Sequence, residues 1–123
     1  MKVLISGSRH WTDIETIASV LEKLPVDTQI IHGAAIGVDT IADVISQELG
    51  MPKAIQFPVS KEEWEKFGKS AGFLRNKRML LETQPDLVIV FIDRSQKSNG
   101  SQSMIDLAET YGYKCIVVSP NNA

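Results

Sequence analysis

Gly7, Ser8 and Arg9 follow the first apolar run of the chain and are residue types that bind anions. Gly7 allows a tight turn that brings backbone N–H groups close to a ligand, Ser8 adds a hydroxyl donor, and Arg9 adds a cation. Trp11 lies close behind them and is a candidate for stacking on a base. A glycine after a strand is most often a simple turn, so this stretch predicts an anion site only together with others like it.

A second stretch of small residues leads from an apolar run into a predicted helix, and its candidates are His32, Gly33, Ala34, Gly37 and Asp39. Free N–H groups and the helix dipole favour negative charge at a helix N-terminus. Asp39 could contact a ribose hydroxyl or cap the helix, and the sequence leaves both roles open. His32 is interpreted as structural, with contact to a ligand as the alternative.

A third stretch, Asn99, Gly100 and Ser101, begins another predicted helix after the fourth apolar run. Ligands of open α/β sheets bind beyond the carboxyl ends of the strands. Since all three stretches follow predicted strands, we expect them to converge on one edge of one sheet and to form a phosphate site there.

A predicted helix brings further cations to this site. Arg75 and Arg78 are three residues apart and are expected to share a helix side, with Asn76 pointing elsewhere. All three are candidate ligand-binding residues, because a pair of arginines suits bidentate recognition of phosphate or carboxylate. The alternative to ligand binding is that these cations form a solvated basic face of the helix. This is the favoured interpretation for Lys77.

Short β-branched runs alternate with segments of helical periodicity along the whole chain. The predicted strands are 2–6, 29–32, 54–57, 86–92 and 114–119, and the predicted helices are 14–24, 39–49, 71–83 and 101–112. The charged segment 61–68, which contains Trp64, is predicted to be a short helix or an ordered loop and is a candidate lid. This order predicts the α/β class, as a single Rossmann-like three-layer domain over 1–123, with a mostly parallel five-stranded sheet and helices on both faces.

Composition narrows the classes of function. The 13 basic and 15 acidic residues give a formal charge of −2, which argues against a general polyanion-binding surface. The only cysteine is Cys115, and His10 and His32 are not at metal-ligand spacing with any cysteine or acid, so no metal site is predicted. The longest apolar run, 87–92, is too short to cross a bilayer, and no secretory signal is recognised. We therefore expect a cytoplasmic protein without a membrane partner.

With these motifs the chain resembles the SLOG superfamily, named for the DprA/Smf and LOG proteins, and specifically its small cpYpsA-related, YspA-like branch. The matching residues span nearly the whole chain in the expected order, in the stretches 5–13, 32–40, 71–80 and 100–104. The resemblance implies a Rossmann-like fold and a site for nucleotides or nucleotide derivatives, without a separate cofactor.

In LOG-type members the activity is release of a base from a nucleoside 5′-monophosphate, which relies on an arginine and a glutamate. Arg75 falls on the position of that arginine and is the candidate catalytic residue, but the glutamate position holds Met104. A carboxylate is the natural group to stabilise the oxocarbenium character of such a reaction, and methionine cannot replace it. Asp39 or Asp106 could substitute, although nothing in the sequence places either one.

The sequence is compatible with three functions. The favoured one is a binding module, a sensor or sequestering domain for AMP, ADP-ribose or an NAD-related molecule. The alternative is a LOG-like phosphoribohydrolase or related N-glycosidase, in which case the protein is an enzyme. A DprA-like protein that binds single-stranded DNA is the weakest, because it requires a broad basic groove with stacking aromatics. The resemblance also implies a homodimer or higher homo-oligomer.

Overall fold

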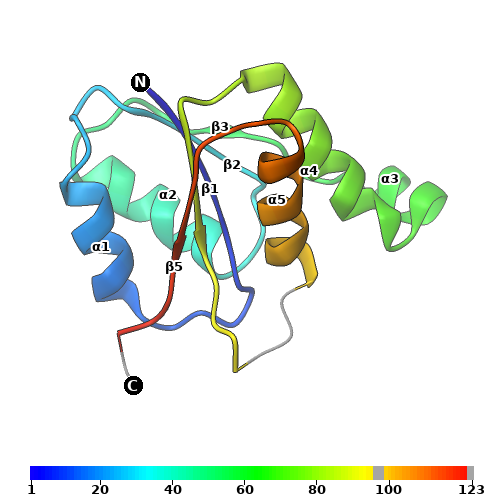
Figure 1. The fold of residues 1–123 in the computed structure, drawn as a ribbon, viewed down its shortest axis with the longest axis horizontal. Coiled ribbons are helices and arrows are strands. Elements are labelled where there is room, and N and C mark those ends of the chain that lie inside the picture. Colours follow the sequence, from blue (N-terminus) through cyan, green and yellow to red (C-terminus); the bar gives the residue numbers. More distant parts are fainter. Residues whose placement is uncertain (96–98, 122–123) are drawn as a thin grey trace.

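Strands and helices alternate along the chain in the computed structural model, which describes residues 1–95 and 99–121 (Figure 1). Its elements are β1 (Lys2–Gly7), α1 (Ile14–Glu22), β2 (Gln29–His32), α2 (Val38–Glu48), β3 (Ile55–Gln56), α3 (Lys61–Phe67), α4 (Ser70–Thr83), β4 (Leu87–Phe91), α5 (Asn99–Thr110) and β5 (Cys115–Val118). Each predicted strand and helix is present. The segment predicted as a helix or a loop is the helix α3.

The strands form one parallel sheet in the order β3-β2-β1-β4-β5. The predicted Rossmann-like α/β class is confirmed, with a sheet that is parallel throughout rather than mostly parallel. The chain moves from β1 outward to β2 and β3, and then returns to the other side of β1 with β4 and β5. Such a reversal opens a crevice at the carboxyl ends of the two central strands.

Two apolar layers hold helices to the two faces of this sheet (Figure 1). On one face, α1 and α2 pack on Val3, Ile5 and Ile89, and on the other, α4 and α5 pack on Leu4 and Val88. The side chains alternate between the faces because successive residues of a strand point in opposite directions. All five residues of β4 are buried, as expected for a strand covered on both sides.

The edge elements are the least buried. The predicted strand 54–57 is reduced to two residues, because β3 pairs with β2 only at Ile55 and Gln56. Helix α3 has no buried residue, and it extends beyond α4, away from the sheet (Figure 1). None of the helices in the described ranges is long and apolar enough to cross a membrane.

Candidate functional site

A cavity of about 870 Å³ opens at the carboxyl edge of the sheet, where the predicted site was expected. Its walls come from the loops after β1 and β2, from α3 and α4, and from the first turn of α5. Eight of the candidate residues line it: Gly7, Arg9, Gly33, Ala34, Arg75, Asn76, Gly100 and Ser101.

The cavity also has walls that the sequence motifs did not indicate. These come from the segment between β3 and α4 and from the neighbours of the predicted residues: His10, Ala35, Ile36, Pro58, Val59, Trp64, Lys69, Gly72, Phe73 and Ser103. His10, Ala35, Ile36, Gly72, Phe73 and Ser103 lie within the stretches that match the family, and Trp64 was already a candidate lid residue. Pro58, Val59 and Lys69 lie outside every stretch that the sequence marked.

Six of the described candidates do not line the cavity: Ser8, Trp11, His32, Gly37, Asp39 and Arg78. Ser8 is buried, and its hydroxyl accepts from the N–H of Asp93 (3.0 Å). The indole of Trp11 packs edge-on against Phe91 and donates to the carbonyl of Asp13 (2.7 Å). Gly37 has φ +88°, and a Cβ there would stand 2.4 Å from the carbonyl oxygen of Arg9. Gly37 therefore allows the two loops to approach each other closely. The side chain of Asn99, another candidate, lies outside the described residues.

Of the two arginines that were expected to share a helix side, only Arg75 lines the cavity. The Arg78 guanidinium stacks over Phe57 and lies 4.0 Å from carboxylate oxygens of both Glu63 and Glu82, on the exposed side of α4. Both arginines contact Phe57, Arg75 through the backbone carbonyl and Arg78 over the ring, but only Arg75 reaches the cavity.

Arg75 is held by neutral acceptors. Its Nε donates to the amide oxygen of Asn76 (2.9 Å), and its Nη1 donates to the carbonyls of Gly33 (2.5 Å) and Phe57 (3.1 Å). Asn76 was expected to point away from Arg75, but the two side chains are in contact. Asn76 is buried, and its Nδ2 donates to the carbonyl of Gly100 (3.3 Å). Nη2 has no hydrogen-bond partner among the described residues.

The electrostatic balance of the cavity is positive. Arg9, Lys69 and Arg75 line it, and none of the described lining residues is an aspartate or a glutamate. Burial lowers the pKa of Arg75, and the charge of Asp39 opposes that shift only in part. The cation thus lacks a direct ion pair within the described chain, although its pKa remains far above neutrality for an arginine.

Asp39 neither caps the helix α2 nor faces the cavity. One of its carboxylate oxygens accepts from the N–H groups of Gly33 (3.0 Å) and Ala35 (3.2 Å), in the loop before the helix. Burial raises the pKa of this carboxyl, opposed by the hydrogen bond from Ala35 and the charge of Arg75. Asp39 therefore fixes the loop whose Gly33 carbonyl holds Arg75.

His32 fixes the same loop from its other side. Its Nδ1 accepts from the N–H of Ala34 (2.9 Å), so the proton of the neutral ring is on Nε2, which donates to Asp43. Together with Asp39, this uses the N–H groups of Gly33, Ala34 and Ala35 within the protein. These three N–H groups of the loop are consequently occupied by side chains of the protein.

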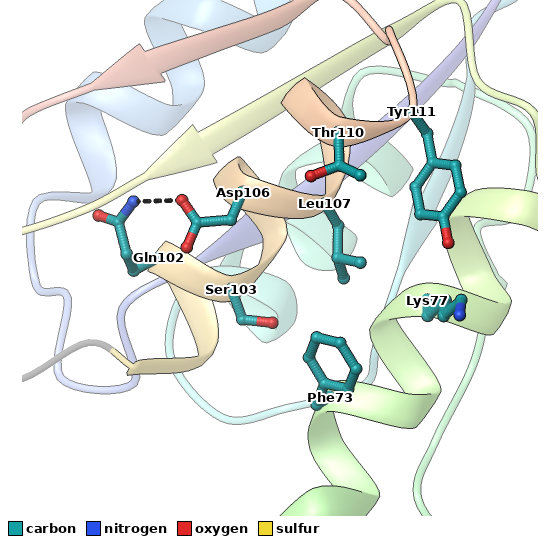
Figure 2. A pocket seen from close by; sticks show the side chains of 8 residues that line it. All are labelled: Phe73, Lys77, Gln102, Ser103, Asp106, Leu107, Thr110 and Tyr111. Atoms are coloured by element: carbon teal, nitrogen blue, oxygen red, sulfur yellow. Dashed lines mark hydrogen bonds between the residues drawn. The ribbon is translucent and has the colours of Figure 1, made fainter.

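The two alternative acids and the position of the family glutamate also lie outside this cavity. Met104 is fully buried in the layer between α5 and the sheet, while the neighbouring Ser101 and Ser103 line the cavity. Asp106 lines a second cavity of about 540 Å³ between α4 and α5 and accepts there from Gln102 (3.0 Å; Figure 2).

Comparisons with known proteins agree with this architecture. The profile of the YspA, cpYpsA-related SLOG family matches residues 1–61. The chain is also similar to the "Gene 61 protein" of Mycobacterium phage D29, with 37% identity over 84 residues, which cover 64% of this chain and 67% of the phage protein.

Proposed function

Because the chain belongs to the YspA, cpYpsA-related SLOG family, we propose that its cavity binds a nucleotide or nucleotide-derived ligand through a phosphate group. Candidate ligands are AMP, ADP-ribose and NAD-related molecules, and the corresponding role is that of a sensor or a sequestering module. Membership of the family supports a nucleotide-related function, and the chemistry of the cavity supports the phosphate.

The observation that carries this proposal is the state of Arg75. Its guanidinium is half-buried, its acceptors are two carbonyls and one amide, and no described carboxylate is within ion-pair distance. A partly desolvated cation without a counter-ion is costly, and an anionic ligand removes that cost. The fixed Nε and Nη1 leave the Nη2 edge to donate to a phosphate oxygen without further ordering of the side chain.

Binding without hydrolysis is favoured over the phosphoribohydrolase alternative. That reaction needs a carboxylate near the ribose, and the described lining residues include none. Asp39 is committed to two backbone N–H groups, and Asp106 belongs to the other cavity.

Two arginines on the same helix provide the test. Calorimetric titrations of AMP, ADP-ribose and NAD are made with the wild-type protein, Arg75→Gln and Arg78→Gln. We expect at least one ligand to bind and Arg75→Gln to weaken it roughly ten- to hundredfold, as for a lost hydrogen bond to a charged group. Arg78→Gln should weaken it much less, because Arg78 does not line the cavity. Binding of none of these ligands, or equal effects of the two substitutions, would contradict the proposal.

A second measurement separates binding from turnover. The wild-type protein is incubated with AMP, and free adenine is followed by chromatography. We expect none above the protein-free control, and release of adenine that Arg75→Gln abolishes would establish the hydrolase instead.

A further inference from the structure

We propose that Trp64 and Phe73 form a base-binding subsite, so that the cavity selects nucleotides over phosphorylated sugars. The inference rests on the proposed function, since it places a base relative to a phosphate held at Arg75. It adds the part of the ligand that is recognised and the helix that recognises it.

The two kinds of chemistry in the cavity come from different elements. The cations Arg9 and Arg75 belong to the loop after β1 and to the second turn of α4. The aromatic side chains come from α3 and the first turn of α4, as Trp64 and Phe73. A ligand with an anionic group and a flat apolar group can therefore meet both, as a nucleotide does.

Trp64 is placed as a platform rather than as a core residue. Its side chain is 46% exposed although it is the largest on α3, a helix without any buried residue. Its Cη2 lies 3.8 Å from the position that a Cβ of Gly72 would occupy, so the indole rests against α4 where that helix has no side chain. One part of the ring is thus supported by the protein and the remainder is open to a ligand.

The first turn of helix α3 is ordered by a capping box. The hydroxyl of Ser60 accepts from the N–H of Glu63, and the Glu63 carboxylate accepts from the N–H of Ser60, both at 3.1 Å. The same carboxylate group lies 4.0 Å from Arg78 of α4. The helix that carries Trp64 is therefore formed before a ligand arrives, which lowers the entropy cost of binding.

Phe73 forms the adjoining wall. It is 47% exposed, and its ring projects from α4 into the space between this helix and Ser103 of α5 (Figure 2). Phe73 and Ser103 line both cavities, so they mark the boundary between them. A base that stacks on Trp64 would have Phe73 on its flank.

This chemistry predicts that ligands with a base bind more tightly than ligands without one, and that different bases bind with similar affinity. Stacking on an aromatic side chain raises affinity roughly five- to hundredfold per base and tolerates every base, since each presents a π-face. The described lining residues contain no carboxylate that could select a particular hydrogen-bonding edge. AMP and GMP should accordingly bind with similar affinity, and ribose 5-phosphate should bind much more weakly.

The test is a comparison of two ligands that differ only in the base. AMP and ribose 5-phosphate are titrated into the wild-type protein, Trp64→Ala, Trp64→Phe and Phe67→Ala. Phe67 is the matched control, because it is an exposed aromatic residue of the same helix that does not line the cavity. We expect Trp64→Ala to weaken AMP at least about fivefold and to leave ribose 5-phosphate unchanged, while Trp64→Phe restores most of the affinity for AMP.

The outcomes separate the two proposals. If AMP binds and Trp64→Ala weakens neither ligand, or both equally, the base subsite is wrong and the phosphate site stands. If neither ligand binds to the wild-type protein, both fail for this class of ligand.

Fluorescence gives an independent readout. The only tryptophans of the chain are Trp64 and the buried Trp11. Saturation with AMP should quench the emission of the wild-type protein and leave that of Trp64→Phe unchanged, whereas ribose 5-phosphate should quench neither. Equal quenching by AMP in both proteins would overturn the assignment of Trp64.

Discussion

At the scale of single residues, Gly33 and Arg75 depend on each other. The carbonyl of Gly33 accepts from Arg75, and a Cβ at position 33 would stand 2.5 Å from Nη1 and 2.6 Å from Cζ of that side chain. The absence of a side chain at Gly33 is thus what allows the guanidinium to lie flat against the loop.

Gly33→Ala is therefore expected to act through Arg75. It should displace the guanidinium and weaken AMP roughly tenfold, the scale of one hydrogen bond to a charged group. Calorimetric titration of Gly33→Ala, Arg75→Ala and the double variant measures the coupling. Gly33→Ala should cost no further affinity in the Arg75→Ala background, and fully additive losses would contradict this interpretation.

Residue types alone predicted the Gly33 and Arg75 walls of the cavity, but not that Arg78 would lie outside its lining. Arg75 and Arg78 are the same residue type on the same helix, so the sequence does not distinguish them. Their orientation depends on contacts with Phe57 and Asn76, which the fold brings close. Ser8 and Trp11 likewise stand at the expected loop, but their side chains turn into the interior because Asp93 and Phe91 offer partners there.

At the scale of elements, the connection from β2 to α2 is held by two carboxylates with opposite titration behaviour. They are Asp39 and Asp43, one turn apart on α2. Burial raises the pKa of Asp39. Burial would also raise the pKa of Asp43, but hydrogen bonds from His32 and Gln47 outweigh it and the pKa is lowered.

The two aspartates should therefore give opposite pH dependence of stability. A raised folded pKa means that Asp39 contributes stability at pH below its ordinary value of 3.8, and that this contribution is lost as the pH rises through the folded pKa. The free energy of unfolding of the wild type minus that of Asp39→Asn should accordingly fall from acidic to neutral pH. Urea unfolding over a pH series measures this difference.

Asp43→Asn is the control on the same helix. Its lowered pKa means that Asp43 contributes stability above pH 3.8, which is lost as the pH falls through the folded pKa. The free energy of unfolding of the wild type minus that of Asp43→Asn should therefore rise toward neutral pH. If the difference in the free energy of unfolding between the wild type and Asp39→Asn also rises toward neutral pH, the loop stabilises the ionised form of Asp39, and the prediction is wrong.

Elements were more predictable than their contacts. Periodicity placed the helices within a few residues, because apolar spacing reports directly which side of a helix is buried. The role of Asp39 was not predictable, since capping a helix and bracing the preceding loop require the same residue at the same place. Helix α3 lacked a clear apolar side, and for that reason the sequence allowed either a helix or a loop.

At the scale of the whole molecule, a single sheet separates two apolar layers. This arrangement buries the position at which LOG-type members carry their glutamate. Met104 lies in the layer between α5 and the sheet, fully buried with Leu4, Val88 and Met79. The sequence indicated that a carboxylate was missing there, but it did not indicate that the position faces the interior.

Met104→Glu is expected to damage the fold without creating an enzyme. An uncompensated buried carboxylate should lower the free energy of unfolding by about 3–5 kcal/mol, measured by urea or thermal denaturation. Chromatography should detect no adenine from AMP. A stable variant that releases adenine would show that position 104 reaches the cavity.

The parallel sheet and its layers followed from the alternation of strands and helices, and the expected edge of the sheet holds the cavity. The wall from 58 to 73 did not follow, because it is brought to that edge only by the packing of α4 on α5 and the sheet.

Helix α3 has a consequence for how such a protein can diverge. Because the helix adds nothing to either apolar layer, substitutions on it are largely uncoupled from the stability of the sheet. Relatives could therefore exchange the residues of this helix and acquire new ligand preferences without first gaining extra stability. The least buried helix is, on this reasoning, the most evolvable part of the molecule.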